Sequence, residues 1–168
     1  GKWKASDRRC VHMAVDIFAP AGTAVHAPLK GEVVVAEYRE GSLDYGGMIV
    51  LRHETPQGDR FFTLYGHLDP AFLGTLDIGS IVAAGAAFCT FGAQDVNGGW
   101  APHLHFQVMT DMLSQKNNFF GVGHDSLWDV WSGICPDPNL ILRLAPETGA
   151  LLDLRPTSYH SGLWPKSF

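Results

Sequence analysis

The sequence has few cysteines for its length: three among 168 residues, at Cys10, Cys89 and Cys135. Their odd number and wide spacing, without a CxxC pair, exclude a disulfide framework and a zinc site built from thiolates. We therefore expect all three to be reduced, buried thiols.

Long hydrophobic runs and clusters of positive charge are also missing. The most apolar stretch, residues 81–93, contains Gly85 and Gly92 and is too short to span a bilayer. The formal net charge is −5, and the Lys/Arg cluster that a phosphate-binding surface needs does not occur. These absences exclude a membrane-spanning segment and argue against a nucleic-acid partner.

Helical periodicity is absent until about residues 125–131. The 19 glycines and 10 prolines of the chain instead separate short runs rich in β-branched and aromatic residues, at 31–38, 48–53 and 60–65. Residues 45–47 and 57–59, between such runs, are typical of hairpin turns. The pattern predicts an all-β, antiparallel protein with at most a short helix.

The chain also shows a weak internal repeat. Residues 21–34 (AGTAVHAPLKGEVV) and 78–92 (IGSIVAAGAAFCTFG) each run through a glycine, an apolar pair, small residues, a second glycine and a new strand. From about residue 111 the sequence becomes loop-rich, which predicts a cap or edge and no second core. We expect one domain over residues 1–144 and an extension or linker over residues 145–168.

Four histidines and one aspartate stand in contexts that suggest chemistry: His12, Asp16, His67, His103 and His105. If residues 101–109 (APHLHFQVM) form a strand, His103 and His105 point to the same face. Two histidines on a solvent-exposed face without a function would give the same sequence pattern. A catalytic zinc takes three nitrogen or oxygen ligands and keeps one position for water. Two imidazoles and one carboxylate suffice for that, which leaves two histidines for proton transfer and electrostatic stabilisation.

The same residues carry a family resemblance. The segments HMAVDIFAPAGTAVHAPLKGEVV, DYGGMIVLRHE, LYGHLD and PHLHFQV follow one another over residues 9–108 as in the lysostaphin-type, LytM-like zinc endopeptidases. The resemblance implies a β-sandwich hybrid with a duplicated motif. It implies one Zn²⁺ per chain, bound by His12, Asp16 and His105. It also makes His103 and His67 the catalytic pair, with His103 as the preferred proton acceptor and His67 stabilising the oxyanion.

The resemblance further implies a substrate class. Such enzymes cut peptide bonds in peptidoglycan cross-bridges or stems, often beside glycine or D-residues, in a groove between loops. Here residues 98–100 and the loop around Asp44 and Tyr45 are candidates for the groove walls. Some members carry a tyrosine about six residues before the first ligand, where this chain has Ser6. That departure implies a different rate or substrate range.

Two other classes of function compete with the hydrolase. One is a non-catalytic zinc-binding or docking module within a larger enzyme, as in degenerate relatives that activate wall amidases. Those relatives typically lose ligands, whereas all five positions are present here. The other is a metal-dependent phosphohydrolase, which usually needs more carboxylates and two metals. Only Asp16 falls in the motif set, so the zinc endopeptidase is favoured.

A second resemblance concerns the chain's wider context. Residues 96–108 (VNGGWAPHLHFQV) and 121–142 (GVGHDSLWDVWSGICPDPNLIL) resemble the version of this domain found inside long bacterial proteins. There it lies between an aminoglycoside-phosphotransferase-like kinase domain and a class III, pyridoxal-phosphate aminotransferase domain. The resemblance implies covalently fused partner domains, a cytoplasmic location and a cytoplasmic peptide or amide substrate. Without the fusion, a cell-envelope, periplasmic or secreted protein is expected.

The remaining candidates have structural interpretations. His26 is expected to be a half-buried strand residue, and His53 to pack or hydrogen-bond at a strand end. Trp128 and Trp131 lie three apart on the expected short helix, which favours packing against the core over a carbohydrate platform.

Overall fold

A computed structural model describes residues 9–144. Its centre is a six-stranded sheet in the order β2-β9-β6-β5-β4-β7, in which every neighbouring pair is antiparallel. The strands are β2 (Val15–Phe18), β4 (Gly31–Arg39), β5 (Gly46–Glu54), β6 (Arg60–Leu68), β7 (Ile81–Val82) and β9 (His103–Met109). The predicted all-β, antiparallel class is confirmed, and the three expected strands correspond to β4, β5 and β6.

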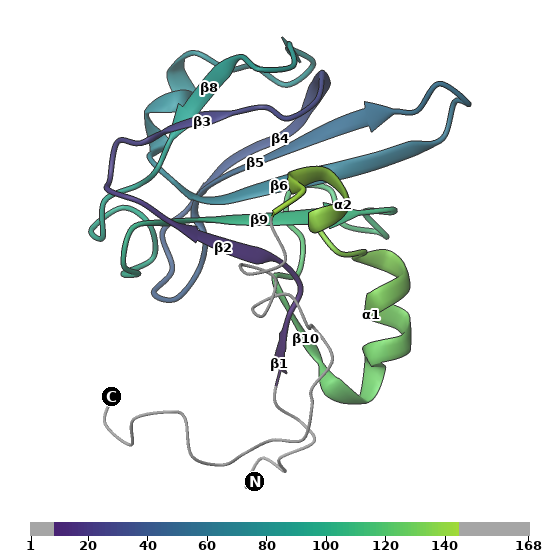
Figure 1. Cartoon of the computed structure of the whole chain (residues 1–168). Helices are drawn as coiled ribbons and strands as arrows, with labels where there is room; N and C mark the ends of the chain where they lie inside the picture. Colours follow the sequence, from purple (N-terminus) through teal and green to yellow (C-terminus); the bar gives the residue numbers. More distant parts are fainter. Residues whose placement is uncertain (1–8, 145–168) are drawn as a thin grey trace, which may run out of the picture.

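Two smaller ribbons, each a separate two-stranded sheet, lie beside this sheet (Figure 1). In one, β3 (Ala24–His26) pairs with β8 (Ala87–Thr90); in the other, β1 (Arg9–His12) pairs with β10 (Val122–His124). The β1–β10 ribbon joins the first described residues to the loop-rich segment after the main sheet. This segment packs over one face of the main sheet, which is the first of the two expected alternatives, a cap or an edge; strand β10 was not predicted.

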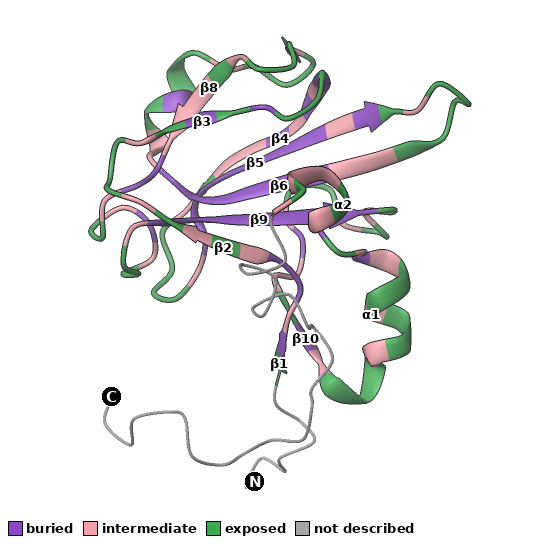
Figure 2. Ribbon diagram, viewed as in Figure 1, coloured by how far each residue is buried: buried purple, intermediate pink, exposed green. Residues whose placement is uncertain are grey.

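The six-stranded sheet is buried on both faces because successive side chains of a strand point to opposite sides. On β5, Ile49 and Leu51 belong to a core shared with the β3–β8 ribbon, whereas Met48 and Val50 belong to a core shared with β1 and helix α1. Figure 2 shows the resulting burial of the central strands β5, β6 and β9. Strand β9, which carries the paired histidines, is buried along its whole length.

The internal repeat has a structural counterpart. The two segments pair with each other through reciprocal backbone hydrogen bonds, which relate them by an approximate two-fold. In one pair, Gly22 N donates to Phe91 O (2.9 Å) and Phe91 N donates to Thr23 O (2.9 Å). In the other pair, Gly79 N donates to Val33 O (2.8 Å) and Val33 N donates to Ser80 O (2.9 Å). The duplicated motif is thus also a unit of strand pairing, since β3 pairs with β8 and β4 pairs with β7.

Helices are few and short. A 3₁₀ turn, η2 (Pro70–Gly74), begins after Asp69, whose carboxylate accepts from Ala71 N. A second, η3 (Asp125–Leu127), continues into α1 (Trp128–Ile134), and α2 (Asn139–Leu142) adds one further turn. The expected short helix and the packing of Trp128 and Trp131 against the core are confirmed, whereas α2 was not expected.

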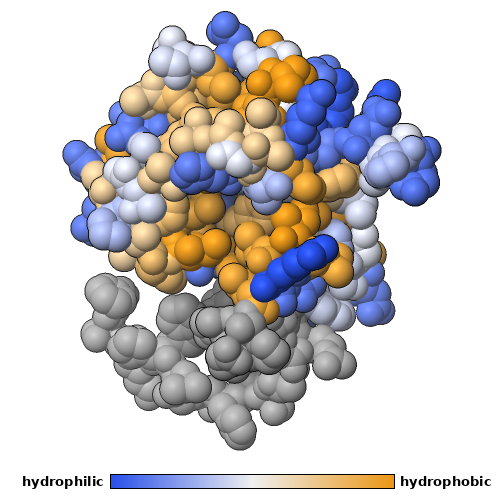
Figure 3. All heavy atoms as spheres, turned by 45° about the horizontal axis from the view of Figure 1, so that its top comes forward, coloured by the Kyte–Doolittle hydropathy of each residue, from blue (hydrophilic) through white to orange (hydrophobic). Residues whose placement is uncertain are grey.

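The surface mixes apolar and hydrophilic side chains. In Figure 3 apolar side chains spread across the middle of the face, with hydrophilic ones around its edge. Exposed apolar residues include Leu73, Ile78 and Ile81, the last on edge strand β7. Among residues 9–144, no helix has the length and apolar character needed to cross a membrane.

The expected burial of Cys10 and Cys89 and the expected half-burial of His26 need correction. Cys10 is exposed because β1 belongs to a two-stranded ribbon and buries only the neighbouring Val11; Cys135 is buried, and Cys89 is half-buried. His26 is exposed for a similar reason, since in β3 only Val25 points into the core. The predicted extension over residues 145–168 and the departure at Ser6 lie outside the described residues.

His53 is buried in a chain of hydrogen bonds. Its Nδ1 lies 2.8 Å from the carbonyl oxygen of Lys30, and its Nε2 lies 2.7 Å from Thr63 Oγ1. Because a carbonyl only accepts, Nδ1 donates to Lys30 O. Burial lowers the pKa of His53 below 6.5, and the bond to Lys30 only partly opposes this. His53 is therefore neutral in the folded protein near pH 7.

We expect His53→Gln to flatten the pH dependence of stability below pH 6.5. The unfolded chain takes up a proton on His53 at about pH 6.5, whereas the folded chain takes it up only at lower pH. The contribution of His53 to the free energy of unfolding is therefore fully present above pH 6.5. It falls as the pH drops from there toward the pKa of His53 in the folded protein. Urea midpoints between pH 7 and 5 measure the slope. His26→Gln, a change at an exposed histidine, should keep the parent slope, and an unchanged slope in His53→Gln would contradict the prediction.

Candidate metal centre

Strands β2 and β9 bring the aspartate and the paired histidines together. In their antiparallel register Asp16 lies opposite His105, and Phe18 lies opposite His103. Directly opposed residues project from the same face of a sheet, as do residues two apart on one strand. Asp16, Phe18, His103 and His105 therefore share one face.

His12 completes a cluster with Asp16 and His105. It ends β1, and the short connection to β2 turns its side chain back toward Asp16. The distances are 3.1 Å from His12 Nε2 to His105 Nδ1, 3.3 Å from His12 Nε2 to Asp16 Oδ1 and 3.5 Å from His105 Nδ1 to Asp16 Oδ1. Ligands of a tetrahedral zinc with bonds of about 2.0–2.1 Å lie about 3.3–3.4 Å apart. The three atoms thus fit the coordination sphere of zinc without rearrangement of the strands.

The protonation states in this cluster suit a cation. Burial by itself would raise the pKa of Asp16, but the neighbouring imidazoles of His105 and His12 outweigh it and hold this pKa well below its usual range. Burial lowers the pKa of His105, more than the neighbouring Asp16 carboxylate raises it. Asp16 is therefore a carboxylate and His105 a neutral imidazole near pH 7, which are the forms that bind a metal.

His103 and His67 form a second pair beside the cluster. Their ring centroids lie 4.3 Å apart, and His103 Nε2 is 3.7 Å from Asp16 Oδ1. Each ring donates its Nδ1–H to a carbonyl oxygen, His103 to Ala101 at 2.7 Å and His67 to Asn97 at 3.0 Å. In the neutral rings Nε2 is then the unprotonated nitrogen. Burial, and next the proximity of His103, lower the pKa of His67 to about 4.

The backbone holds His67 in an uncommon conformation. Its φ is 62°, a left-handed value that costs a non-glycine residue about 1–3 kcal/mol. Two backbone hydrogen bonds hold it there: His67 N donates to Tyr45 O, and Gly92 N donates to His67 O. The preceding Gly66 leaves room for the Tyr45 ring, because a Cβ at position 66 would lie 2.5 Å from Tyr45 Cδ1. These contacts therefore hold the His67 side chain in its place in spite of the local backbone strain.

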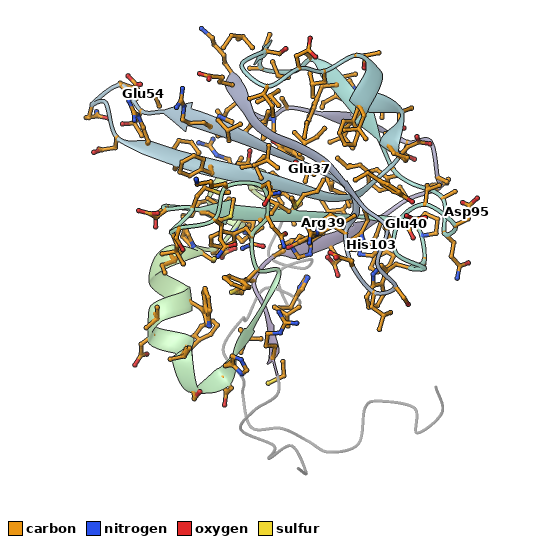
Figure 4. All side chains as sticks on the ribbon, turned by 180° about the vertical axis from the view of Figure 1, so that it is seen from behind. Glu37, Arg39, Glu40, Glu54, Asp95 and His103 are labelled. Atoms are coloured by element: carbon orange, nitrogen blue, oxygen red, sulfur yellow. The ribbon has the colours of Figure 1, made fainter. Side chains whose placement is uncertain are left out.

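All five predicted site residues line one cleft of about 690 Å³. Tyr45, Asp44 and Trp100 contribute to its walls as expected, whereas the glycines before Trp100 do not. Figure 4 shows His103 at the end of the sheet toward Glu40 and Asp95, far from Glu54 at the β5–β6 turn. The cleft thus opens where the loops after β4 and β8 meet the start of β9.

Two residues at the site were missed in the sequence. Phe18, 68% exposed, stacks on the His103 ring with centroids 5.0 Å apart. Gln107, which is fully buried, accepts a hydrogen bond from His105 Nε2 at 3.1 Å. Period-two alternation would have found both, because Phe18 lies two residues after Asp16 and Gln107 two residues after His105.

Comparisons with known proteins identify the family of the chain. A family model described as peptidase family M23 matches residues 10–118. An uncharacterized lipoprotein of Escherichia coli K12, YgeR, is 33% identical over 95 residues, which cover 56% of this chain and 33% of that protein. The match therefore spans about a third of that relative's length.

Two solved structures show partial likeness. The catalytic domain of the antimicrobial peptidase lysostaphin from Staphylococcus simulans shares 27% identity, with 72% of this chain and 79% of that chain covered and a TM-score of 0.47. A mutant catalytic domain of the prophage-encoded M23 protein EnpA from Enterococcus faecalis shares 19% identity, with 64% and 75% covered and a TM-score of 0.47. Since these superpositions are partial, the assignment depends on the family model, which covers well over half of the sequence. The chain belongs to peptidase family M23.

Proposed function

We propose that this domain is a zinc-dependent endopeptidase that hydrolyses peptide bonds. One observation carries the proposal: three ligand atoms spaced for a tetrahedral zinc lie beside two further histidines in the same cleft. A site that only bound a metal would not need the second pair. Membership of a peptidase family points to the same reaction.

In this proposal His12, Asp16 and His105 hold the zinc through Nε2, a carboxylate oxygen and Nδ1. When bound, the metal supplies Lewis-acid polarisation of the peptide carbonyl and lowers the pKa of a water. His103 takes up the water's proton on Nε2, which is the free nitrogen because Nδ1 donates to Ala101 O. His67, whose ring lies 4.3 Å from the His103 ring, is the proposed electrostatic stabiliser of the developing oxyanion.

The proposed substrate is a peptidoglycan-type cross-bridge or stem peptide with glycine or D-residues beside the scissile bond. A cleft of about 690 Å³ lies in the range that holds a short peptide or drug-sized ligand. The name of the lysostaphin structure describes that protein as an antimicrobial peptidase, which agrees with a cell-wall substrate. The unit proposed to carry the activity is residues 1–144, with residues 145–168 as an extension. Fusion to kinase-like and aminotransferase domains, and a cytoplasmic location with it, stay predictions.

The proposal predicts cleavage that depends on the metal. The zinc-loaded protein should release new fragments from purified peptidoglycan or from a panel of glycine and D-amino-acid peptides, detected by mass spectrometry. A chelator should abolish the fragments, and added zinc should restore them. His103→Ala protein, prepared identically, controls for contaminating peptidases. Fragments that persist in chelator would contradict a metallopeptidase, and zinc binding without fragments from any substrate would favour the non-catalytic docking module.

A further inference from the structure

We propose that Gln107 is a positioning residue that fixes His105 with Nδ1 toward the metal, and that it does so by anchoring His105 to the segment 119–135. The inference rests on the proposed function, since it takes His105 as a zinc ligand. It adds a residue outside the ligand set and a part of the chain outside the matched family region, which ends at residue 118.

Gln107 makes three contacts from a fully buried position on β9. Its Oε1 lies 3.1 Å from His105 Nε2. Its Nε2 donates to the carbonyl oxygen of Phe120 at 3.1 Å and to Cys135 Sγ at 3.2 Å. Both acceptors belong to the segment 119–135, so the amide bridges the candidate metal ligand and this segment.

The chemistry of these partners allows one arrangement of protons. The Phe120 carbonyl can only accept, so the NH₂ end of the Gln107 amide must face it and the oxygen end must face His105. An amide oxygen also only accepts, so His105 must carry its proton on Nε2. The lone pair of His105 is then on Nδ1, the atom near His12 and Asp16. A backbone carbonyl thus determines, through one amide, which imidazole nitrogen is available to the metal.

The same segment also supports His12 and the ring of His105. Gly121 O accepts from Met13 N at 3.0 Å, directly after His12, and β10 pairs with β1 opposite His12. Gly121 itself packs against the ring, because a Cβ there would lie 3.0 Å from His105 Cε1. Residues 119–135 therefore contact and support both candidate histidine ligands, His12 and His105.

Zinc affinity of the apo protein tests the inference. Outer hydrogen-bond partners of metal-bound histidines typically contribute about 10- to 100-fold in affinity, so Gln107→Leu should weaken zinc binding by about that factor. Gln107→Glu keeps an acceptor for His105 Nε2 and should stay closer to the parent than Gln107→Leu does. Thr63→Val is the matched control: it removes a fully buried polar group from the neighbouring strand β6, away from the cleft, and should leave zinc affinity unchanged. Competition with a chromophoric chelator gives the affinities.

The tautomer of His105 gives a readout that a general loss of stability would not move. Long-range ¹H–¹⁵N spectra of the unmodified apo protein should show the Nε2–H form, and Gln107→Leu should show a mixture of both forms. An Nδ1–H form in the unmodified protein, or parent-like affinity in Gln107→Leu, would overturn the inference. Equal losses in Gln107→Leu and Thr63→Val would overturn it too, because they would mark a general effect. If the unmodified protein bound no zinc, the proposed function would fail instead.

Discussion

His105→Ala should reduce bound zinc from about one ion per chain to a small fraction of that value. His105 is the most buried member of the candidate ligand set, at 3% exposure, and its Nδ1 lies within 3.5 Å of both other ligand atoms. Its removal leaves only His12 and Asp16 as ligands, whereas catalytic zinc sites keep three protein ligands. Elemental analysis of dialysed protein measures the occupancy.

A histidine on the same strand face serves as the control for this loss. His103→Ala also removes a buried imidazole from β9, two residues away, and should keep the zinc content near that of the parent. Full zinc content in His105→Ala would remove His105 from the ligand set. Loss of zinc in His103→Ala with retention in His105→Ala would mean that the two roles are exchanged.

His103→Ala should lower turnover by at least about a hundredfold on any peptide that the parent cleaves. General acid–base groups typically contribute about 10²- to 10⁴-fold, and His103 Nε2 is the free nitrogen nearest to Asp16 among the two catalytic candidates. His67→Ala should cost about 10²- to 10³-fold, the range found for the loss of one oxyanion donor. Steady-state kinetics at fixed zinc occupancy measures both losses.

The double variant separates a cooperating pair from two independent effects. The His67 and His103 rings lie 4.3 Å apart and would act on one transition state, so their losses should not multiply. The double variant should be less impaired than the product of the single losses. Losses that multiply fully would indicate that one of the two histidines acts elsewhere, for example in substrate binding.

Local sequence patterns predicted much of the fold, because strands and turns depend on short-range alternation and on glycine and proline. Strands β4, β5 and β6, the β5–β6 turn and helix α1 lie close to where the pattern placed them, whereas Gly46 and Gly47 of the other expected turn belong to strand β5, and the β4–β5 connection is residues 40–45. Strand β10 has only three residues and depends on pairing with β1, more than 100 positions earlier. A local sequence pattern therefore does not predict it. The exposure of Cys10 and His26 was missed for a related reason: alternation tells which residues share a face, and the tertiary structure decides which face is covered.

For the site, the sequence alone identifies the candidate ligands and catalytic groups. The ordered histidines and Asp16, and the shared face of His103 and His105, follow from motif order and from period-two geometry. The distances between His12, Asp16 and His105, and the pairing of Asp16 with His105 across β2 and β9, come from the tertiary structure. The same is true of the contact with Gln107 that sets which nitrogen of His105 carries the proton. These depend on strand register and on partners such as Phe120 and Cys135, which are distant in sequence. A linear pattern specifies which groups are available, whereas packing between distant segments specifies where their atoms lie and which of them carry protons.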